Sequence, residues 1–112
     1  MEFREKQMGG TTVITIIGSI DALTAAEVTT FLSAQVQDGK RQLVADLSQV
    51  DFMSSAGLRA ILATLKESRQ GGGDLHIAAP QPGVEKILKM SGFTSILKCY
   101  ASVSEAVAGF GG

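Results

Sequence analysis

Two kinds of apolar pattern alternate along this chain: continuous runs, and stretches with helical spacing. The β-branched run at 11–17 and the apolar run at 43–47 have the composition of buried strands. Between them, apolar residues recur at the spacing of one helical face, which predicts a helix over about 22–37. Strands that alternate with helices predict a parallel or mixed sheet with helices packed on it.

Glycines, prolines and capping residues indicate where these elements begin and end. A glycine pair at 9–10 separates strand-like segments at 2–8 and 11–18, which predicts an antiparallel hairpin and therefore a mixed sheet. Thr24 with Glu27 matches a capping box at the start of the first helix. The same signals predict the remaining elements: a helix end at Asp38–Gly39, a strand at 50–53, a helix at about 56–70 ended by three glycines, a strand at 75–79, a helix opened by Pro82 and ended by Gly92, a short strand at 96–100, and a final helix capped by Ser102 with Glu105.

These elements predict a single α/β domain over residues 1–112, with a mixed β-sheet, an N-terminal hairpin and about four packed helices. The chain has 112 residues, of which 45% are hydrophobic, and this is enough for one modest core that must be mostly aliphatic. No internal repeat and no linker-like segment divides the sequence.

Charge and composition exclude several classes of function. Ten basic and eleven acidic residues leave a formal net charge of -1 and no basic stripe, so we expect no nucleic-acid partner. No apolar run approaches the roughly 20 residues of a spanning helix. The mixed charges of residues 2–6 are unlike a signal peptide, so we expect no membrane insertion. Cys99 is the only cysteine and cannot form an internal disulfide, which favours a cytoplasmic location.

Few residues in the chain are suited to catalysis. His76 lies in an apolar run and is expected to be a half-buried structural residue, while Cys99 is expected to pack in the core or at a sheet edge. A triad of Ser55, His76 and Asp46 has no supporting spacing, and Ser55 lacks the Gly-x-Ser-x-Gly elbow of hydrolases. Neither a metal-ligand cluster nor a phosphate-binding glycine loop is present. We therefore expect no enzyme activity, no cofactor, no metal and no catalytic residue.

The segment 50–59 carries the strongest functional signal. A short apolar strand ends in Ser54 and Ser55, and a helix with an apolar stripe begins directly after them. A helix N-terminus has unpaired N–H groups and the positive end of the helix dipole, so a serine there can cap the helix or carry a phosphate. Capping is the simplest role for Ser55. Gly57 costs up to about 1 kcal/mol relative to alanine in the first turn, which indicates that another backbone approaches closely.

Asp21, which follows the second strand of the hairpin, is a further candidate. It can cap the first helix, but Thr24 and Glu27 already form the expected capping box there. The role of Asp21 is therefore only partly explained by the helix end.

These residues resemble a known family, the STAS domain in its bacterial anti-sigma factor antagonist form. The resemblance covers almost the whole chain, and its most specific part is the segment from Phe52 to Leu58. The matching segments are Gly18–Asp21, Leu43–Leu47, Val50–Leu58 and Leu88–Phe93. The chain departs from the common pattern in having Ser54 where many members have Asp, Ala56 where many have a second hydroxyl, and Arg59 where many have Gly.

The resemblance implies a regulatory protein whose partner is a nucleotide-bound anti-sigma factor that is also a serine kinase. The unphosphorylated antagonist binds this partner and releases a sigma factor; phosphorylation ends the binding, and a serine phosphatase restores it. Alignment on Gly57 and Leu58 assigns the phosphate to Ser55, with Ser54 as the alternative acceptor. The residues expected to contact the partner are Asp21, Ser54, Ser55, Gly57 and Arg59.

Two other functions stay open at this point. The domain can be a STAS subunit of a transporter or of a lipid-trafficking complex, because such assemblies also use this module. It can also be a small nucleotide-binding or hydrolytic α/β enzyme that uses Ser55.

Overall fold

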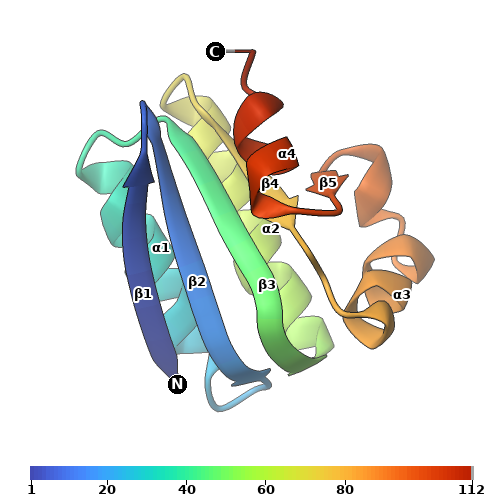
Figure 1. Cartoon of the computed structure of the whole chain (residues 1–112). Helices are drawn as coiled ribbons and strands as arrows, with labels where there is room; N and C mark the ends of the chain where they lie inside the picture. The colour runs from blue at the N-terminus through green and yellow to red at the C-terminus, as the bar shows by residue number, and fades with distance from the viewer. Residues whose placement is uncertain (112) are drawn as a thin grey trace.

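The five strands of the computed structural model form one sheet in the order β1-β2-β3-β4-β5 (Figure 1). The structure describes residues 1–111. The first pair of strands is antiparallel, whereas each later pair is parallel. The predicted mixed sheet with an N-terminal hairpin is therefore confirmed. The strands are β1 (Glu2–Met8), β2 (Thr11–Ile20), β3 (Gln42–Met53), β4 (Asp74–Ala78) and β5 (Lys98–Tyr100).

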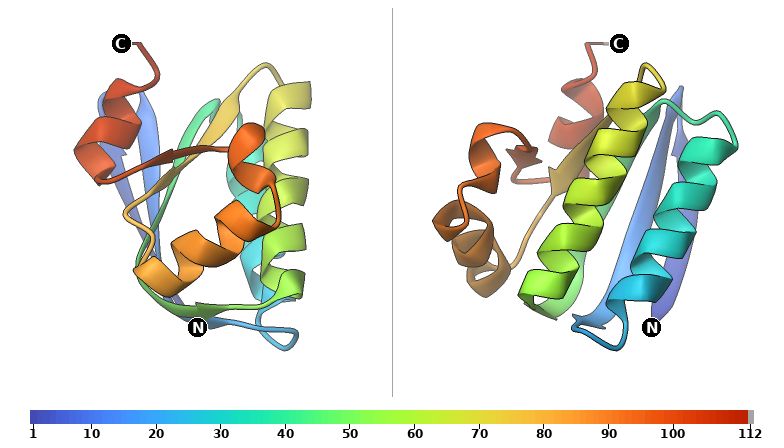
Figure 2. Two further views of the ribbon diagram at one scale, coloured as in Figure 1. Left: turned by 90° about the vertical axis from the view of Figure 1, so that its right-hand side faces the viewer. Right: turned by 180° about the vertical axis from the view of Figure 1, so that it is seen from behind.

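Helices cover both faces of this sheet, but unequally. Within residues 1–111 they are α1 (Ala25–Gln37), α2 (Ser55–Gln70), α3 (Pro82–Met90) and α4 (Val103–Ala108), with a 3₁₀ turn η1 (Phe93–Ser95) before β5. Figure 2 shows α1 and α2 side by side across one face, while α4 lies on the other. None of these helices combines the length and the apolar character needed to cross a membrane.

The main core lies between the sheet and the helices α1, α2 and α3. It is aliphatic, as the composition predicts, because strand positions facing the helices carry Ile, Leu and Val. Its largest fully buried side chains include Ile14, Ile16, Leu32, Leu43, Leu47, Ile61, Leu65 and Leu88. A smaller cluster under α4 contains Val13, Val44, Ala78 and Ala106.

The strand β3 corrects one prediction. The sequence indicates two strands, at 43–47 and 50–53, but the structure has one continuous strand of 12 residues. Its register with β2 is irregular at two places, between Thr15 and Ile17 and between Gly18 and Ser19, and β3 has an extra residue at each. Each extra residue forms a β-bulge. The bulges interrupt the alternation of buried and exposed positions along β3, but its pairing with β2 continues.

The ends of the elements follow their capping signals with small shifts. Gly39 adopts φ +88° directly after the Asp38 cap of α1. Its N–H donates to the Val36 carbonyl at 3.0 Å, and the Lys40 N–H donates to the Gln35 carbonyl at 3.2 Å. This is a Schellman end, which requires a left-handed residue and therefore favours glycine.

The last third of the chain has a shorter strand than predicted. The sequence indicates a strand at 96–100, but only Lys98–Tyr100 pairs with β4. The Leu97 N–H instead donates to the Phe93 carbonyl at 2.8 Å, because the chain is still turning after η1. The predicted cap of α4 is confirmed, since the Ser102 hydroxyl accepts the Glu105 N–H at 3.1 Å.

His76 is a structural residue, as predicted, but it is fully rather than half buried. It lies between the sheet and the C-terminal segment, where its ring stacks on Phe110 with centroids 3.7 Å apart. Its Nδ1 is 2.9 Å from the Ala106 carbonyl, which can only accept, so Nδ1 carries a proton. The side chain therefore helps to hold α4 on the sheet.

Candidate functional site

The candidate site lies where β2 and β3 end side by side, at the bottom of Figure 1. Ile20 and Met53 are register partners in the last paired step of the two parallel strands. One residue later, the Ser54 N–H donates to the Ile20 carbonyl at 2.8 Å. The loop that begins with Asp21 therefore leaves the sheet next to the start of α2. The fold thus brings together residues that are more than 30 positions apart in the sequence.

Asp21 shapes the loop between β2 and α1. Its Oδ1 accepts the N–H groups of Leu23 at 2.9 Å and Thr24 at 3.0 Å, which is an Asx-turn. The hydrogen bonds from Thr24 and then Leu23 lower the pKa of the Asp21 carboxyl below its ordinary value. The side chain is partly exposed, so it can also face a partner.

The predicted capping box at Thr24 is wrong. Thr24 is the N-cap of α1, but its side chain makes no capping hydrogen bond to the helix. Its hydroxyl donates to the Ser19 carbonyl at 2.7 Å and accepts the Asp21 N–H at 3.0 Å. Because the hydroxyl is turned back toward β2, it fastens the loop to the strand. Asp21 and Thr24 therefore both stabilise the loop between β2 and α1, and this accounts for the presence of both residues.

The two serines at the start of α2 have different environments. Ser54 is the N-cap, and its hydroxyl accepts the Gly57 N–H at 3.3 Å. Ser55, for which the sequence suggests this capping role, is instead the first helical residue, and its side chain is exposed. Within residues 1–111 the Ser55 hydroxyl makes no hydrogen bond. It is therefore free for chemistry, whereas that of Ser54 is engaged.

Gly57, which the sequence analysis expects in a partner interface, is buried in the domain, and that expectation stays a prediction. A Cβ built on Gly57 would lie 2.8 Å from Cγ2 of Ile20 and 2.9 Å from Cγ of Met53. The carbonyl oxygen of Ile20 would be 3.1 Å away. The close backbone approach that the sequence indicates is real, but it occurs inside the domain. Gly57 lets α2 pack directly against the ends of β2 and β3.

Two exposed apolar side chains border the site, and the sequence analysis did not identify them. Leu23 in the β2–α1 loop is 88% exposed, and Phe52 near the end of β3 is 49% exposed. Nothing in an apolar pattern distinguishes them from core residues, because their exposure depends on the loop and on the bulged register of β3. Beside Phe52, the Ser19 hydroxyl donates to Asp51 at 2.7 Å.

Arg59 completes the exposed part of the site. It begins the second turn of α2, four residues after Ser55, so the two side chains project from the same helix face. Within residues 1–111, Arg59 forms no ion pair. The cluster of Asp21, Leu23, Phe52, Ser55 and Arg59 thus offers a carboxylate, a cation, a hydroxyl and apolar area to a partner.

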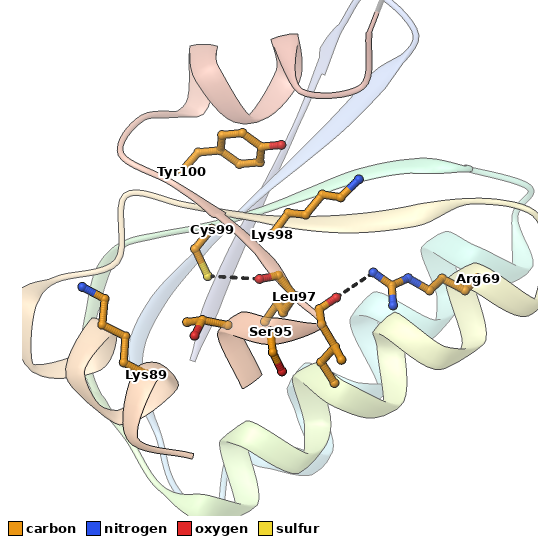
Figure 3. Close-up of a pocket in the computed structure, with 9 residues that line it drawn as sticks. Arg69, Lys89, Ser95, Leu97, Lys98, Cys99 and Tyr100 are labelled. Atoms are coloured by element: carbon orange, nitrogen blue, oxygen red, sulfur yellow. Dashed lines mark hydrogen bonds between the residues drawn. The ribbon is translucent and has the colours of Figure 1, made fainter. Parts of the chain in front are cut away.

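The geometry gives no support to a hydrolytic site. Asp46 bonds the Thr15 hydroxyl at 3.2 Å and the Ser48 N–H at 3.0 Å, and His76 is directed toward α4. Neither residue contacts Ser55, so the triad drawn from the sequence is not assembled. Among residues 1–111 no group of three potential metal ligands is found. The hollow drawn in Figure 3 lies elsewhere, near η1 and β5.

Known proteins are similar to this chain in sequence and in fold. The STAS domain model matches residues 3–106. BtrV of Bordetella bronchiseptica, which carries the name of an anti-sigma factor antagonist, is 34% identical over 110 residues, or 98% of this chain and 95% of BtrV. An anti-sigma factor antagonist from Mycobacterium paratuberculosis has a TM-score of 0.88 and 26% identity over 96% of this chain and 92% of that one. The Bacillus cell fate determinant SpoIIAA, solved in its phosphorylated form, shares the fold with a TM-score of 0.71. It is 21% identical, and the match covers 95% of this chain and 96% of SpoIIAA. The chain therefore belongs to the STAS domain family and is one of its anti-sigma factor antagonists.

Proposed function

We propose that this protein binds an anti-sigma factor through the exposed cluster at the ends of β2 and β3, and so releases a sigma factor. The observation that carries this proposal is the exposure of Leu23 and Phe52 beside Asp21, Ser55 and Arg59. Large apolar side chains at a protein surface supply much of the binding energy of interfaces when polar groups surround them. The name of the relative BtrV supports the class of partner.

We further propose that the partner is a nucleotide-bound serine kinase and that it phosphorylates Ser55. The Ser55 hydroxyl is exposed and has no hydrogen bond within residues 1–111, so a kinase can reach it without breaking a contact. The Ser54 hydroxyl accepts the Gly57 N–H and is partly buried, so its modification would remove the cap of α2. SpoIIAA provides a precedent for a phosphorylated protein of this fold. A serine phosphatase would reverse the modification.

Phosphorylation is expected to act on the interface. A phosphate adds about -1.5 to -2 charges at neutral pH. At Ser55 that charge meets the N–H groups and the positive dipole end of α2, so the domain tolerates it. Against a partner, the same charge and bulk would add to an exposed surface that otherwise offers apolar side chains and a neutral hydroxyl. The phosphorylated form therefore loses affinity although its fold is preserved.

The test uses the purified protein, ATP and a candidate anti-sigma factor of the serine kinase type, chosen from genes that neighbour its own. We expect one phosphate, mapped by mass spectrometry to Ser55, and loss of the complex after modification. Ser55→Ala should bind the kinase and stay unmodified, while Ser54→Ala should still be phosphorylated. Circular dichroism confirms that each variant is folded.

Two results would contradict the proposal at different levels. Full phosphorylation of Ser55→Ala at Ser54 would show that the acceptor is wrongly assigned. Absence of any complex between the unmodified protein and the kinase would refute the proposed partner itself.

A further inference from the structure

We propose that Arg59 binds the phosphate once Ser55 is phosphorylated, so that the modification also withdraws a cation from the partner surface. This inference rests on the proposed phosphorylation of Ser55 and adds the residue that holds the modified side chain. Arg59 is a positioning residue in this proposal, because it holds the phosphate and takes no part in its transfer.

The contacts of Arg59 give it no role in the fold. The residue is exposed, and within residues 1–111 its side chain forms neither an ion pair nor a hydrogen bond. Arg4 and Arg69, in contrast, bind carboxylates at 2.9 and 3.0 Å. Arg59 is also the only charged residue in the stretch 54–65. Its guanidinium is therefore available to a ligand.

Helix geometry places the Arg59 side chain next to that of Ser55, the first residue of α2. Residues four apart on a helix are neighbours, with Cβ atoms about 5–6 Å apart. The Cα–Cβ bonds of a helix tilt toward its N-terminus, so a long side chain at 59 leans over the turn that contains Ser55. An anion four residues before a cation is also the more favourable order. The guanidinium can therefore reach a phosphate on Ser55 without a change in the backbone.

The carboxylates near the site already have partners of their own. Oδ1 of Asp21 accepts the N–H groups of Leu23 and Thr24, and Oδ1 of Asp51 accepts the Ser19 hydroxyl at 2.7 Å. No acidic residue lies in the first turn of α2. A phosphate on Ser55 would therefore be the first anion on this helix within reach of Arg59.

A guanidinium is well suited to this task. Its planar fork can donate two N–H groups to two phosphate oxygens, which an ammonium group cannot do in the same fixed geometry. A phosphoserine has a second pKa of about 6, and a neighbouring cation lowers that pKa because it favours the dianion. The positive end of the helix dipole acts in the same direction, but it does so whichever residue stands at position 59. The contribution of Arg59 can therefore be measured as a difference between variants.

Binding of the phosphate changes what the surface offers to a partner. In the unmodified protein, Arg59 is a free cation beside a neutral hydroxyl. In the modified protein, the cation is paired within the chain, and a phosphate with about -1.5 to -2 charges leaves the pair with an excess of negative charge. A partner carboxylate that pairs with Arg59 thus loses its cation and meets an anion instead.

The experiment uses the full chain with phosphoserine incorporated at position 55 during translation, so that no kinase is needed. Titration followed by ³¹P NMR gives the second pKa of the phosphate. We expect the midpoint with Arg59 to lie at least about 0.3 pH units below that of Arg59→Gln, which removes the cation but keeps a good helix former. Arg59→Lys should restore part of this difference, because it keeps the charge and loses the fork.

The matched control is Lys66→Gln, which removes one positive charge from an exposed position of the same helix. Lys66 lies about 16 Å along the helix axis from Ser55, beyond the Debye length of about 8 Å at 0.15 M salt. Its removal should leave the midpoint unchanged. Equal midpoints for the wild type and Arg59→Gln would refute binding of the phosphate by Arg59, and so would an equal rise in Lys66→Gln and Arg59→Gln. If the kinase does not modify Ser55, the proposed function is contradicted, and the titration still decides whether Arg59 binds a phosphate there.

Discussion

Gly57 lies where α2 packs against the sheet, and an added methyl group at this residue would disturb that packing. Its added Cβ would come within 3 Å of the fully buried Ile20 side chain and of Met53, and neither has free space to move into. Overpacking of this kind costs about 1–3 kcal/mol, against a gain of up to about 1 kcal/mol from the better helix propensity of alanine. We expect Gly57→Ala to lower the free energy of unfolding by about 1–2 kcal/mol, measured by urea denaturation.

The matched control is Gly83→Ala in α3. No atom lies within 4 Å of a Cβ built there, so only the propensity term acts and the variant should be as stable as the wild type or more so. A Gly57→Ala protein that is as stable as Gly83→Ala would contradict the packing role of Gly57. The larger Gly57→Val should be destabilised further, so weak binding by that variant would not identify a partner surface.

Asp21 gives the domain a specific dependence on pH. Its carboxylate accepts two N–H groups of the loop, and these hydrogen bonds hold its pKa in the folded state below its ordinary value. Stability from this group is therefore fully present above about pH 4–5 and is lost as the pH falls through the folded pKa. Asp21→Asn keeps an acceptor but does not titrate. We expect the Tm advantage of the wild type over Asp21→Asn to shrink as the pH is lowered toward 3, measured by thermal melts. An advantage that grows on acidification would reverse the assigned sign.

At the scale of the element, the N-terminus of α2 places a cap and the proposed modification site in consecutive residues. Ser54 satisfies a helix donor, and Ser55 stands free beside the positive end of the dipole. We expect phosphorylation of Ser55 to leave the Tm unchanged or to raise it by up to about 5 °C, since charge at a helix N-terminus is worth about 0.3–1 kcal/mol in the favourable direction. Circular dichroism melts of both forms test this. A loss of many degrees would mean that the switch operates by unfolding.

The same helix end makes Ser54 and Ser55 distinguishable by stability alone. Ser54→Ala removes the cap and should cost about 0.5–2 kcal/mol. Ser55→Ala removes no hydrogen bond within residues 1–111 and should cost much less. Equal losses in urea denaturation would contradict the assignment of the cap to Ser54.

At the scale of the whole molecule, the proposed interface and the core are made of different residues. Leu23 and Phe52 are exposed and contribute little to the core, yet they flank the polar groups of the proposed interface. We expect Leu23→Ala and Phe52→Ala each to weaken binding to the anti-sigma factor by about tenfold, or 1.4 kcal/mol, with nearly unchanged Tm. Calorimetric titration measures the affinity.

Met90→Ala is the matched control for this surface. Met90 is 77% exposed at the end of α3 and is not part of the exposed cluster at the ends of β2 and β3, so its loss should leave the affinity unchanged. If Leu23→Ala and Phe52→Ala bind as Met90→Ala does, the partner uses another face of the domain.

The sequence by itself determined the order and type of the elements, because hydrophobic spacing and capping residues are local signals. The hairpin about the glycine pair, the end of α1 at Gly39 and the cap of α4 by Ser102 all follow from residues within a few positions of one another. The segment 52–58 likewise indicated the family, and the segment 50–59 identified the two serines, Gly57 and Arg59 as candidate functional residues.

Only the tertiary structure decided what each of these residues does. The roles of Ser54 and Ser55 depend on which one begins the helix, and the role of Gly57 depends on Ile20, which lies 37 positions earlier. The exposure of Leu23 and Phe52 follows from a loop held by Asp21 and from the bulges of β3. These features arise from pairing between distant strands, which fixes register and burial, and no local pattern encodes that pairing.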